Sequence, residues 1–199
     1  MRSVRTALAA AALLLAACGG GPPEPAALPS QGAIPDLIGV PVIVFPVQLR
    51  QGVAGDPTSE LVYALAERGQ GVRWLMPDSL RAVLRRSPSL DVPLEQMPVG
   101  VFLRQEVDRI GDPIFGYLRR LNAVTGGRVA LIPVEIRPRA ATAESPATLQ
   151  ITAVLLDALS GRVYWFGVVE GAPGDGSDPR ALASVADALA RRILPPPGG

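Results

Sequence analysis

The loop GAPGDGSDP, residues 171–179, holds the side chains of this chain that are best placed to do chemistry. Asp175 and Asp178 lie among glycines, and carboxylates together with loop carbonyl oxygens can bind Ca²⁺. The loop lacks the full spacing of a calcium-binding loop and its distal Glu. Asp178 also precedes Pro179 and an apolar pattern of helical spacing, which predicts a helix cap. A flexible turn therefore explains the loop better, and Asp175 and Asp178 are only weak metal candidates.

The residues for most other catalytic mechanisms are missing. The chain has no His, which removes His-based general bases, His triads and most zinc sites. Its single cysteine lies in the export-type segment at the start of the chain and is not expected to act as a catalytic thiol. Ser59, Ser79 and Ser160 have no Lys or His beside them in sequence that could activate a hydroxyl as a nucleophile. We therefore expect no enzyme activity and no cofactor.

The stretch LLDALSGRVYWFGVVEG, residues 155–171, places a carboxylate and a small turn before three aromatic residues. Asp157 can accept the amides of a turn, and Gly161 can take the left-handed backbone conformation that such a connection requires. A hairpin explains both residues more simply than a ligand site does. Trp165 then faces the opposite side from its two aromatic neighbours. It is either buried beneath a helix or exposed at a partner-binding surface.

The only cysteine, Cys18, follows a segment typical of protein export. Arg2 and Arg5 precede a short apolar run, residues 7–17, which is too short to cross a membrane as a helix. Leu-Ala-Ala-Cys followed by three glycines resembles the lipobox of bacterial lipoproteins, although a cysteine incidental to an ordinary secretory signal is the alternative. In lipoproteins the thiol receives a diacylglyceryl group, the signal is cut before it, and the new amino terminus is commonly acylated.

The lipobox resemblance implies that residues 1–17 are a signal peptide and that Cys18 carries palmitate-type acyl chains. Two or three such chains hold a protein firmly at a membrane surface. By analogy with the sorting rule of enteric bacteria, Gly19 in place of Asp implies delivery to the outer membrane. We therefore expect a lipid-anchored protein of the cell envelope, on the periplasmic face of the outer membrane.

The charge of the chain gives no reason to expect nucleic-acid binding. Its 19 basic residues, all of them Arg, are nearly balanced by 18 acidic ones. Removing residues 1–17 takes away Arg2 and Arg5 but no acid, so the mature chain has 17 − 18 = −1. A near-neutral domain lacks the basic surface that phosphate backbones require.

The remaining sequence predicts a short linker and one α/β domain. Residues 18–39, rich in Gly, Pro and Ala, are expected to be a flexible linker, residues 40–194 a single domain, and residues 195–199 a disordered tail. Asp-Pro pairs before apolar patterns predict helix starts, and apolar runs predict strands. The expected helices cover 56–69, 78–86, 101–110, 112–126 and 178–193, and the expected strands cover 40–45, 72–76, 128–137, 149–157 and 162–170.

This order of elements predicts a mixed, mostly central sheet of about five strands, packed by three to five helices. Pro133 within the strand at 128–137 predicts an edge position or a bulge. In the strand at 149–157 both alternating sets are largely apolar, which predicts that helices cover both sides of the sheet there.

Several short motifs together resemble a module of envelope proteins. They are VPVIVFP near the start, ALAERG, VRWLMP with PDSLRAVL, and above all LLDALSGRVYW, in which Asp157, Gly161, Val163 and Trp165 match the late hairpin. The module is shared by the amino-terminal domain of TolB, the curli secretion-channel lipoprotein CsgG and lipoprotein activators of penicillin-binding proteins. The resemblance spans most of residues 40–194 and implies a TolB-like α/β domain used for protein contacts in the envelope.

The chain departs from two of these relatives. Curli-type channels need two long amphipathic hairpins, and only one hairpin is predicted here. TolB continues into a propeller, and this sequence ends at Gly199 without repeats. We therefore expect a non-catalytic, membrane-anchored lipoprotein that binds another envelope protein or assists assembly, with a homo-oligomer also compatible. The alternatives are a small carboxylate-based hydrolase or ligand-binding lipoprotein, and an oligomeric secretion-channel subunit of curli type.

Overall fold

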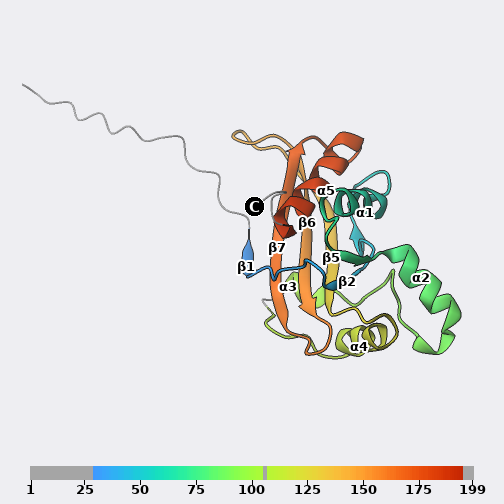
Figure 1. Cartoon of the computed structure of the whole chain (residues 1–199). Helices are drawn as coiled ribbons and strands as arrows, with labels where there is room; N and C mark the ends of the chain where they lie inside the picture. The colour runs from blue at the N-terminus through green and yellow to red at the C-terminus, as the bar shows by residue number, and fades with distance from the viewer. Residues whose placement is uncertain (1–28, 105–106, 195–199) are drawn as a thin grey trace, which may run out of the picture.

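A seven-stranded mixed sheet forms the centre of the computed structural model, which describes residues 29–104 and 107–194 (Figure 1). Its strands are β1 (Ser30–Gly32), β2 (Pro41–Val44), β3 (Leu49–Arg50), β4 (Arg73–Leu75), β5 (Val129–Arg139), β6 (Thr148–Asp157) and β7 (Val163–Pro173). The strand order is β1-β7-β6-β5-β2-β4, with β3 also paired to β5. The pairs among β2, β3, β4 and β5 are parallel, whereas β6 with β5, β6 with β7, and β1 with β7 are antiparallel. The fold is thus the expected α/β class.

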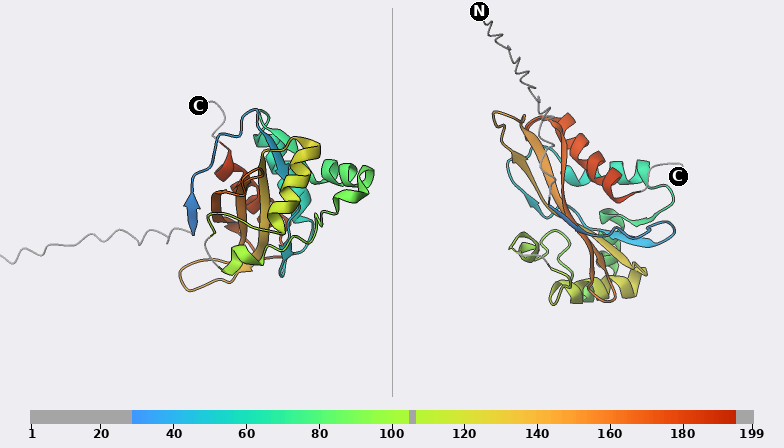
Figure 2. Two further views of the ribbon diagram at one scale, coloured as in Figure 1. Left: turned by 90° about the horizontal axis from the view of Figure 1, so that it is seen from below. Right: turned by 90° about the vertical axis from the view of Figure 1, so that its left-hand side faces the viewer.

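Helices cover both faces of the sheet. They are α1 (Pro57–Arg68), α2 (Pro77–Arg86), α3 (Gly100–Arg104), α4 (Ile114–Thr125) and α5 (Pro179–Ile193), with a short 3₁₀ turn, η1 (Pro88–Leu90), after α2. Helices α1 and α5 lie together on one face, and α3 and α4 lie on the other (Figure 2). None of the helices in the described residues has the length and apolar character needed to cross a bilayer.

Two apolar cores, one on each face, follow from the two-residue period of the strands. In β6, Leu149 and Leu155 enter the core beneath α1 and α5, whereas Val154 and Leu156 enter the core beneath α2 and α4. The prediction that this strand is covered on both sides is therefore confirmed. The residues of both cores run from Leu37 to Leu194.

The Asp-Pro pairs begin helices in two of three places as expected. Asp56 accepts hydrogen bonds from the first amides of α1, and Asp178 accepts one from the first turn of α5. At α4 the expected start is wrong, because Pro113 occupies the cap position and the helix begins at Ile114. Asp112, joined to Pro113 by a cis peptide bond, still accepts the amide of Gly116 at 3.0 Å.

Two short strands were not expected, and one of them lies in the expected linker. β1 pairs with β7, and Leu37 is only 1% exposed, so residues 30–39 contribute to the domain. The Gly- and Pro-rich composition of residues 18–39 does not predict β1, because a three-residue strand has no periodic apolar pattern and forms only where the edge of a sheet is free to pair with it. The expected signal peptide at 1–17, Cys18 and the tail at 195–199 lie outside the described residues.

Two further expectations are corrected in the middle of the chain. The helix expected over 101–110 is short, because α3 covers Gly100–Arg104 and Arg109 instead forms a β-bridge to Arg162. Strand β5 is interior to the sheet, so the edge position expected for Pro133 is wrong. The alternative, a bulge, is present between Pro133 and Glu135.

Candidate functional site

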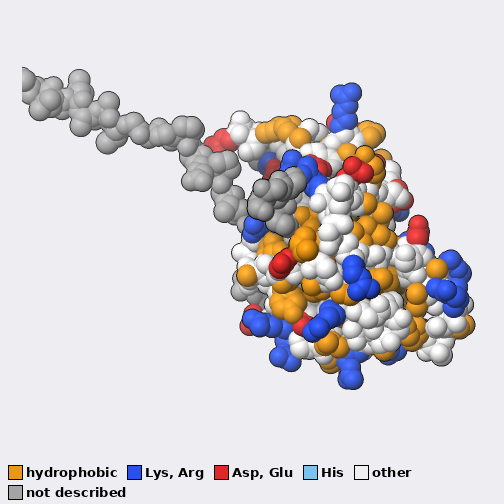
Figure 3. Space-filling view, viewed as in Figure 1, with side chains coloured by type: hydrophobic (Ala, Val, Ile, Leu, Met, Phe, Trp, Pro, Cys, Tyr) orange, Lys and Arg blue, Asp and Glu red, His pale blue; other side chains and the backbone are white. Residues whose placement is uncertain are grey.

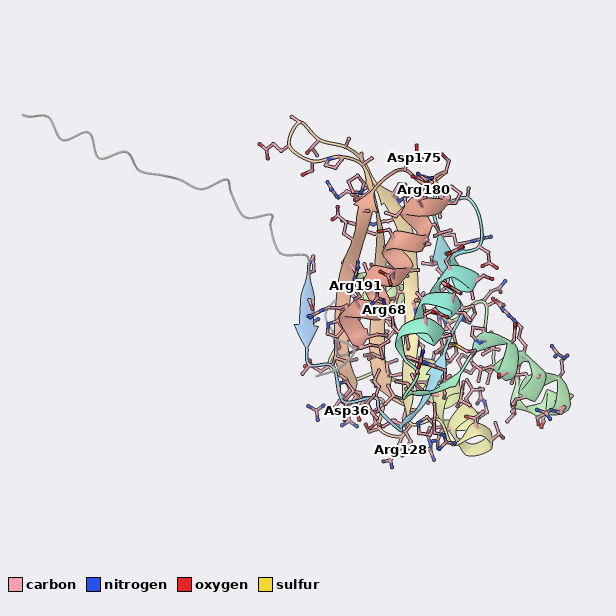
Figure 4. All side chains as sticks on the ribbon, turned by 45° about the horizontal axis from the view of Figure 1, so that its top comes forward. Asp36, Arg68, Arg128, Asp175, Arg180 and Arg191 are labelled. Carbon is pink, nitrogen blue, oxygen red and sulfur yellow. The ribbon has the colours of Figure 1, made fainter. Side chains whose placement is uncertain are left out.

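The side chains singled out in the sequence lie at separate places in the fold. Asp175, with Asp178 three residues further on, lies beside the start of α5, at the end of the molecule opposite to Arg128 (Figure 4). Asp157 and Gly161 form the turn between β6 and β7 at the end where Arg128 lies, because the amide of Ala158 donates to the Arg128 carbonyl. Trp165 is in the core. The fold therefore does not gather these residues into one site.

The carboxylates of the 171–179 loop are engaged in local hydrogen bonds. Asp175 accepts from the amide of Ser177 at 2.8 Å and from its hydroxyl at 2.6 Å, and these bonds lower the pKa of Asp175. Asp178 accepts from the amide of Arg180 at 2.8 Å as the cap of α5. Across residues 29–104 and 107–194, no three acidic, His or Cys side chains group in a way that could hold a metal ion. Both aspartates thus have a structural explanation.

Asp157 organises the β6–β7 turn. Its Oδ1 accepts from the amides of Leu159 and Ser160, both at 2.8 Å, and its Oδ2 accepts from the Tyr164 hydroxyl at 2.5 Å. Burial acts to raise the pKa of Asp157, but these hydrogen bonds outweigh burial, so the pKa is lowered. Gly161 has φ +71°, the left-handed region that a Cβ would strain. These contacts describe a turn and not a ligand site.

Tyr164→Phe is expected to destabilise this turn by about 1–2 kcal/mol, because it removes a hydrogen bond to a charged, partly buried group. The effect depends on pH with a definite sign. Since the pKa of Asp157 is lower in the folded state than in the unfolded chain, its stabilisation is present above the unfolded pKa of about 4 and is lost as the pH falls through the folded pKa. Urea unfolding of both proteins should therefore show a larger difference near pH 7 than near pH 3. A difference that does not change with pH would contradict the role given to Asp157.

Trp165 is 1% exposed and cannot serve as a surface for a partner. Its Nε1 donates to Ser30 Oγ at 3.0 Å, and the Arg192 guanidinium lies 5.9 Å from the ring centroid. Of the two interpretations left open by the sequence, the structure selects burial. Trp165 joins the first strand of the domain to its last helix.

A polar network on the sheet was not anticipated from the sequence. Glu170 accepts from Arg139 at 2.6 Å and from Thr148 at 2.6 Å, and Gln150 donates to its second oxygen at 3.3 Å. Burial acts to raise the pKa of Glu170, but the bonds from Arg139, Thr148 and Gln150 outweigh it and the pKa is lowered. A carboxylate that is held ionised and fully hydrogen-bonded is a poor proton acceptor, so this network is structural.

A hollow lined by residues of α1, α2 and the segments that precede them lies between these two helices, and we call it the α1–α2 groove. Its volume is about 840 Å³. Its lining comprises Val47, Gln48, Arg50, Asp56, Thr58, Ser59, Val62, Tyr63, Ala66, Met76, Pro77, Asp78, Arg81 and Glu95.

Topology explains why a groove forms there. Parallel strands β2 and β4 are neighbours, but the chain leaves β2 through β3 to reach α1 on the α5 face, whereas it leaves β4 directly into α2 on the other face. The two connections diverge at the carboxyl ends of the strands, and this switch point is where open α/β sheets characteristically bind ligands. The groove is therefore the best candidate functional site in the described chain.

The groove combines an apolar floor with a prominent aromatic residue. Val47, Val62 and Met76 are buried or half-buried along it. Tyr63 is 66% exposed and also borders a second hollow of about 370 Å³ between α1 and α5. A large aromatic ring standing between two hollows, with most of its surface in water, is the kind of side chain that anchors protein interfaces.

The polar side chains of the groove are already engaged. Ser59 donates to Asp56 at 2.7 Å, and this bond is the main reason that the pKa of Asp56 is lowered. Thr58 accepts the amide of Val47 at 3.1 Å. Gln48 donates to the carbonyls of Pro46 and Leu94 and accepts the amide of Met97. A carboxylate with a lowered pKa is a weak general base, so this arrangement favours binding over acid–base chemistry.

Ion pairs with exposed partners form one rim of the groove. Arg81 contacts Asp78 at 2.6 Å and Glu95 at 2.6 Å, and the side chain of Asp78 is 95% exposed. Such surface pairs contribute little to stability. They leave charge of both signs at the mouth of an apolar floor, as at the rim of a protein interface.

Sequence reasoning missed the groove because its residues come from four separate segments: 47–50, 56–66, 76–81 and Glu95. Tyr63 lies in the helix predicted over 56–69, outside the inward stripe of Leu61 and Leu65, so its exposure was predictable. That exposed face meets Met76 and Glu95 only because the neighbouring strands β2 and β4 lead to helices on opposite faces of the sheet, which no local sequence pattern predicts.

Comparison with known proteins gives structural similarities only. No protein-family profile and no curated protein sequence matches the chain. A point variant of PelC from Paraburkholderia phytofirmans, solved as a dodecamer, is 15% identical over 84% of this chain and 94% of that chain, with a TM-score of 0.42. Lipoprotein GNA1162 from Neisseria meningitidis is 16% identical over 77% of this chain and 96% of that chain, with a TM-score of 0.39. A second crystal form of the PelC dodecamer is 12% identical over 84% and 93%, with a TM-score of 0.41. All three similarities are weak in both sequence and superposition.

Proposed function

We propose that this chain is a non-catalytic, lipid-anchored protein of the cell envelope, and that its α1–α2 groove binds a segment of another envelope protein. The anchor is proposed from the sequence around Cys18. The groove at the β2–β4 switch point is the observation that carries the binding role. The groove's engaged polar groups support binding rather than turnover.

The chemistry of the groove suits a peptide segment that brings an apolar side chain to the floor. Val62 and Met76 offer apolar surface that a partner can remove from water, at roughly 25 cal/mol per Å². Tyr63 offers a ring whose face packs against the partner while its hydroxyl stays hydrated. A small hydrolase would instead need a free acid and base, and Asp56 is occupied by Ser59 and the cap of α1.

Photo-crosslinking in the native envelope tests this role. We expect a photoreactive phenylalanine at Tyr63 to capture one discrete envelope protein. The matched control is Val124 on α4, which is also exposed, at 45%, and lies outside the groove. The same products from both positions would show that the groove has no selective partner, and a product of twice the chain's mass would identify a second copy as the partner.

Tyr63→Ala should then weaken binding of the captured partner by roughly 30-fold, as expected for the loss of an aromatic anchor at the centre of an interface. Folding should be unaffected, because the side chain is mostly in solvent. Titration of purified partner against parent and variant measures the effect. An unchanged affinity would contradict the proposed site.

A further inference from the structure

Arginines stand at the start of three strands that begin at the same end of the sheet. Arg73 is the first residue of β4, Arg128 directly precedes β5, and Arg162 directly precedes β7. Strand β4 is parallel to β2 and β2 to β5, while β7 is antiparallel to β6 and β6 to β5, so all three strands point the same way. Arg109 is bridged to Arg162 and joins them. We call these four residues the arginine row.

The spacing of the row follows from the strand order. β7 and β5 are two strands apart, and so are β5 and β4. At about 4.8 Å per strand, Arg128 lies about 10 Å from Arg162 on one side and about 10 Å from Arg73 on the other, in a line across the sheet. Strands β5 and β7 begin at the lower end of the molecule in Figure 1, and Figure 3, in the same view, shows Arg side chains in blue along that lower edge. The row is therefore an extended line of charge at one end of the fold.

The row is exposed, and no ion pair within the described part of the chain neutralises its charge. All four arginines are exposed, and the ion pairs found among the described residues involve none of them. Three aspartates also lie at this end. Asp36 is at the same end of the molecule as Arg128 in Figure 4, the carbonyl of Asp108 accepts the amide of Val163, and Asp157 accepts the Tyr164 hydroxyl. Arg109 spends one donor on the carbonyl of Ser160 at 3.1 Å. The guanidinium groups thus keep donors available for an anion, which they can bind in a bidentate way.

Two exposed apolar side chains interrupt the row. Leu159, at the tip of the β6–β7 turn between Arg128 and Arg162, is 49% exposed. Ile38, bridged to Val72 next to Arg73, is 55% exposed. Protruding apolar residues set among basic ones are typical of surfaces that lie on a membrane, because the first enter the headgroup region and the second contact lipid phosphates.

The position of the row fits the proposed anchor. Ser30 pairs with Gly167, five residues along β7 from Arg162, or about 17 Å from the row. Residues 18–29 can span at most about 40 Å. An anchor at Cys18 can therefore lie in the same membrane plane that the arginine row touches. This step rests on the proposed anchor, whereas the row and its apolar residues do not.

We propose that the arginine row, with Leu159 and Ile38, is a membrane-docking surface that binds the phosphate groups of anionic phospholipids. Docked in this way, the domain would present the α1–α2 groove, at the opposite ends of β2 and β4, away from the bilayer. Anchor and row would then act together, one holding the chain at the membrane and the other setting its orientation.

Vesicle binding tests the surface without the anchor. The chain of residues 19–199, made without the leader, keeps every described core residue from Leu37 to Leu194 and is expected to fold. It should bind vesicles of phosphatidylcholine mixed with phosphatidylglycerol and not vesicles of phosphatidylcholine alone, and added salt should weaken binding. Equal affinity for the two vesicles, or no binding to either, would overturn the proposal; the latter is the result expected if an acidic protein occupies this surface. Neither result bears on Cys18 or on the groove.

A matched pair of double variants locates the binding. Arg128→Gln with Arg162→Gln should lower the partition onto mixed vesicles roughly 10- to 30-fold, since each arginine near an anionic surface contributes about fivefold. Arg50→Gln with Arg180→Gln removes the same charge from two exposed arginines that form no ion pair among the described residues. Arg50 lines the α1–α2 groove and Arg180 lies at the end of the molecule opposite to Arg128, so this variant should leave the partition onto vesicles nearly unchanged. Leu159→Ser, which keeps all charges, should weaken it several-fold. Equal losses in the two double variants would refute a localised surface.

Discussion

Cys18→Ser is expected to release the protein from the membrane fraction into the soluble fraction of the cell. The thiol sulfur is the atom that would be alkylated by the diacylglyceryl group, and the serine hydroxyl is a far weaker nucleophile. Each buried methylene of an acyl chain adds about 0.8 kcal/mol of membrane affinity, so loss of two or three chains removes nearly all of it. The arginine row alone should give only weak, salt-sensitive association.

Fractionation and intact-mass measurement check this expectation together. The parent protein should sediment with membranes and carry the added mass of acyl chains on an amino terminus at Cys18. The serine variant should lack that mass. A parent whose mature amino terminus begins elsewhere, or whose Cys18 carries no lipid, would contradict the proposed anchor whatever its distribution between fractions.

The pattern of apolar residues was sufficient to predict the long strands and the helices, but not the two short strands β1 and β3. A strand such as β6 is predictable because the side chains on both of its faces are apolar. Helices α1 and α5 are predictable because Asp56 and Asp178 precede a proline at the helix start. Strands β1 and β3 have three and two residues and exposed or half-exposed side chains, so they carry no periodic signal. They exist only because β7 and β5 offer unpaired backbone beside them.

The candidate site was harder to predict than the fold. The loop with Asp175 and the turn with Asp157 drew attention because acidic residues near glycines resemble binding sites. Their carboxylates instead accept hydrogen bonds from nearby amides and hydroxyls. The groove depends on β2 and β4 sending their helices to opposite faces, and the arginine row depends on three strands sharing one direction. Both features are properties of topology, so no window of sequence contains them.

Trp165→Ala is expected to lower the free energy of unfolding by about 3–5 kcal/mol, the usual cost of truncating a fully buried large aromatic residue. The indole is 1% exposed in the core beneath α1 and α5, and its nitrogen bonds Ser30 in β1. The variant therefore leaves a cavity and removes the only side-chain hydrogen bond described between β1 and β7. For a domain of this size the midpoint of thermal unfolding should fall by roughly 6–20 °C.

Two companion variants separate the causes of this loss. Trp165→Phe keeps most of the buried ring and loses the bond to Ser30, so it should cost less than the alanine variant. Tyr63→Ala removes an aromatic residue that is mostly in solvent and should change stability by no more than about 0.5 kcal/mol. If Trp165→Ala were as stable as Tyr63→Ala, the indole could not be the residue that ties β1 and α5 to the sheet.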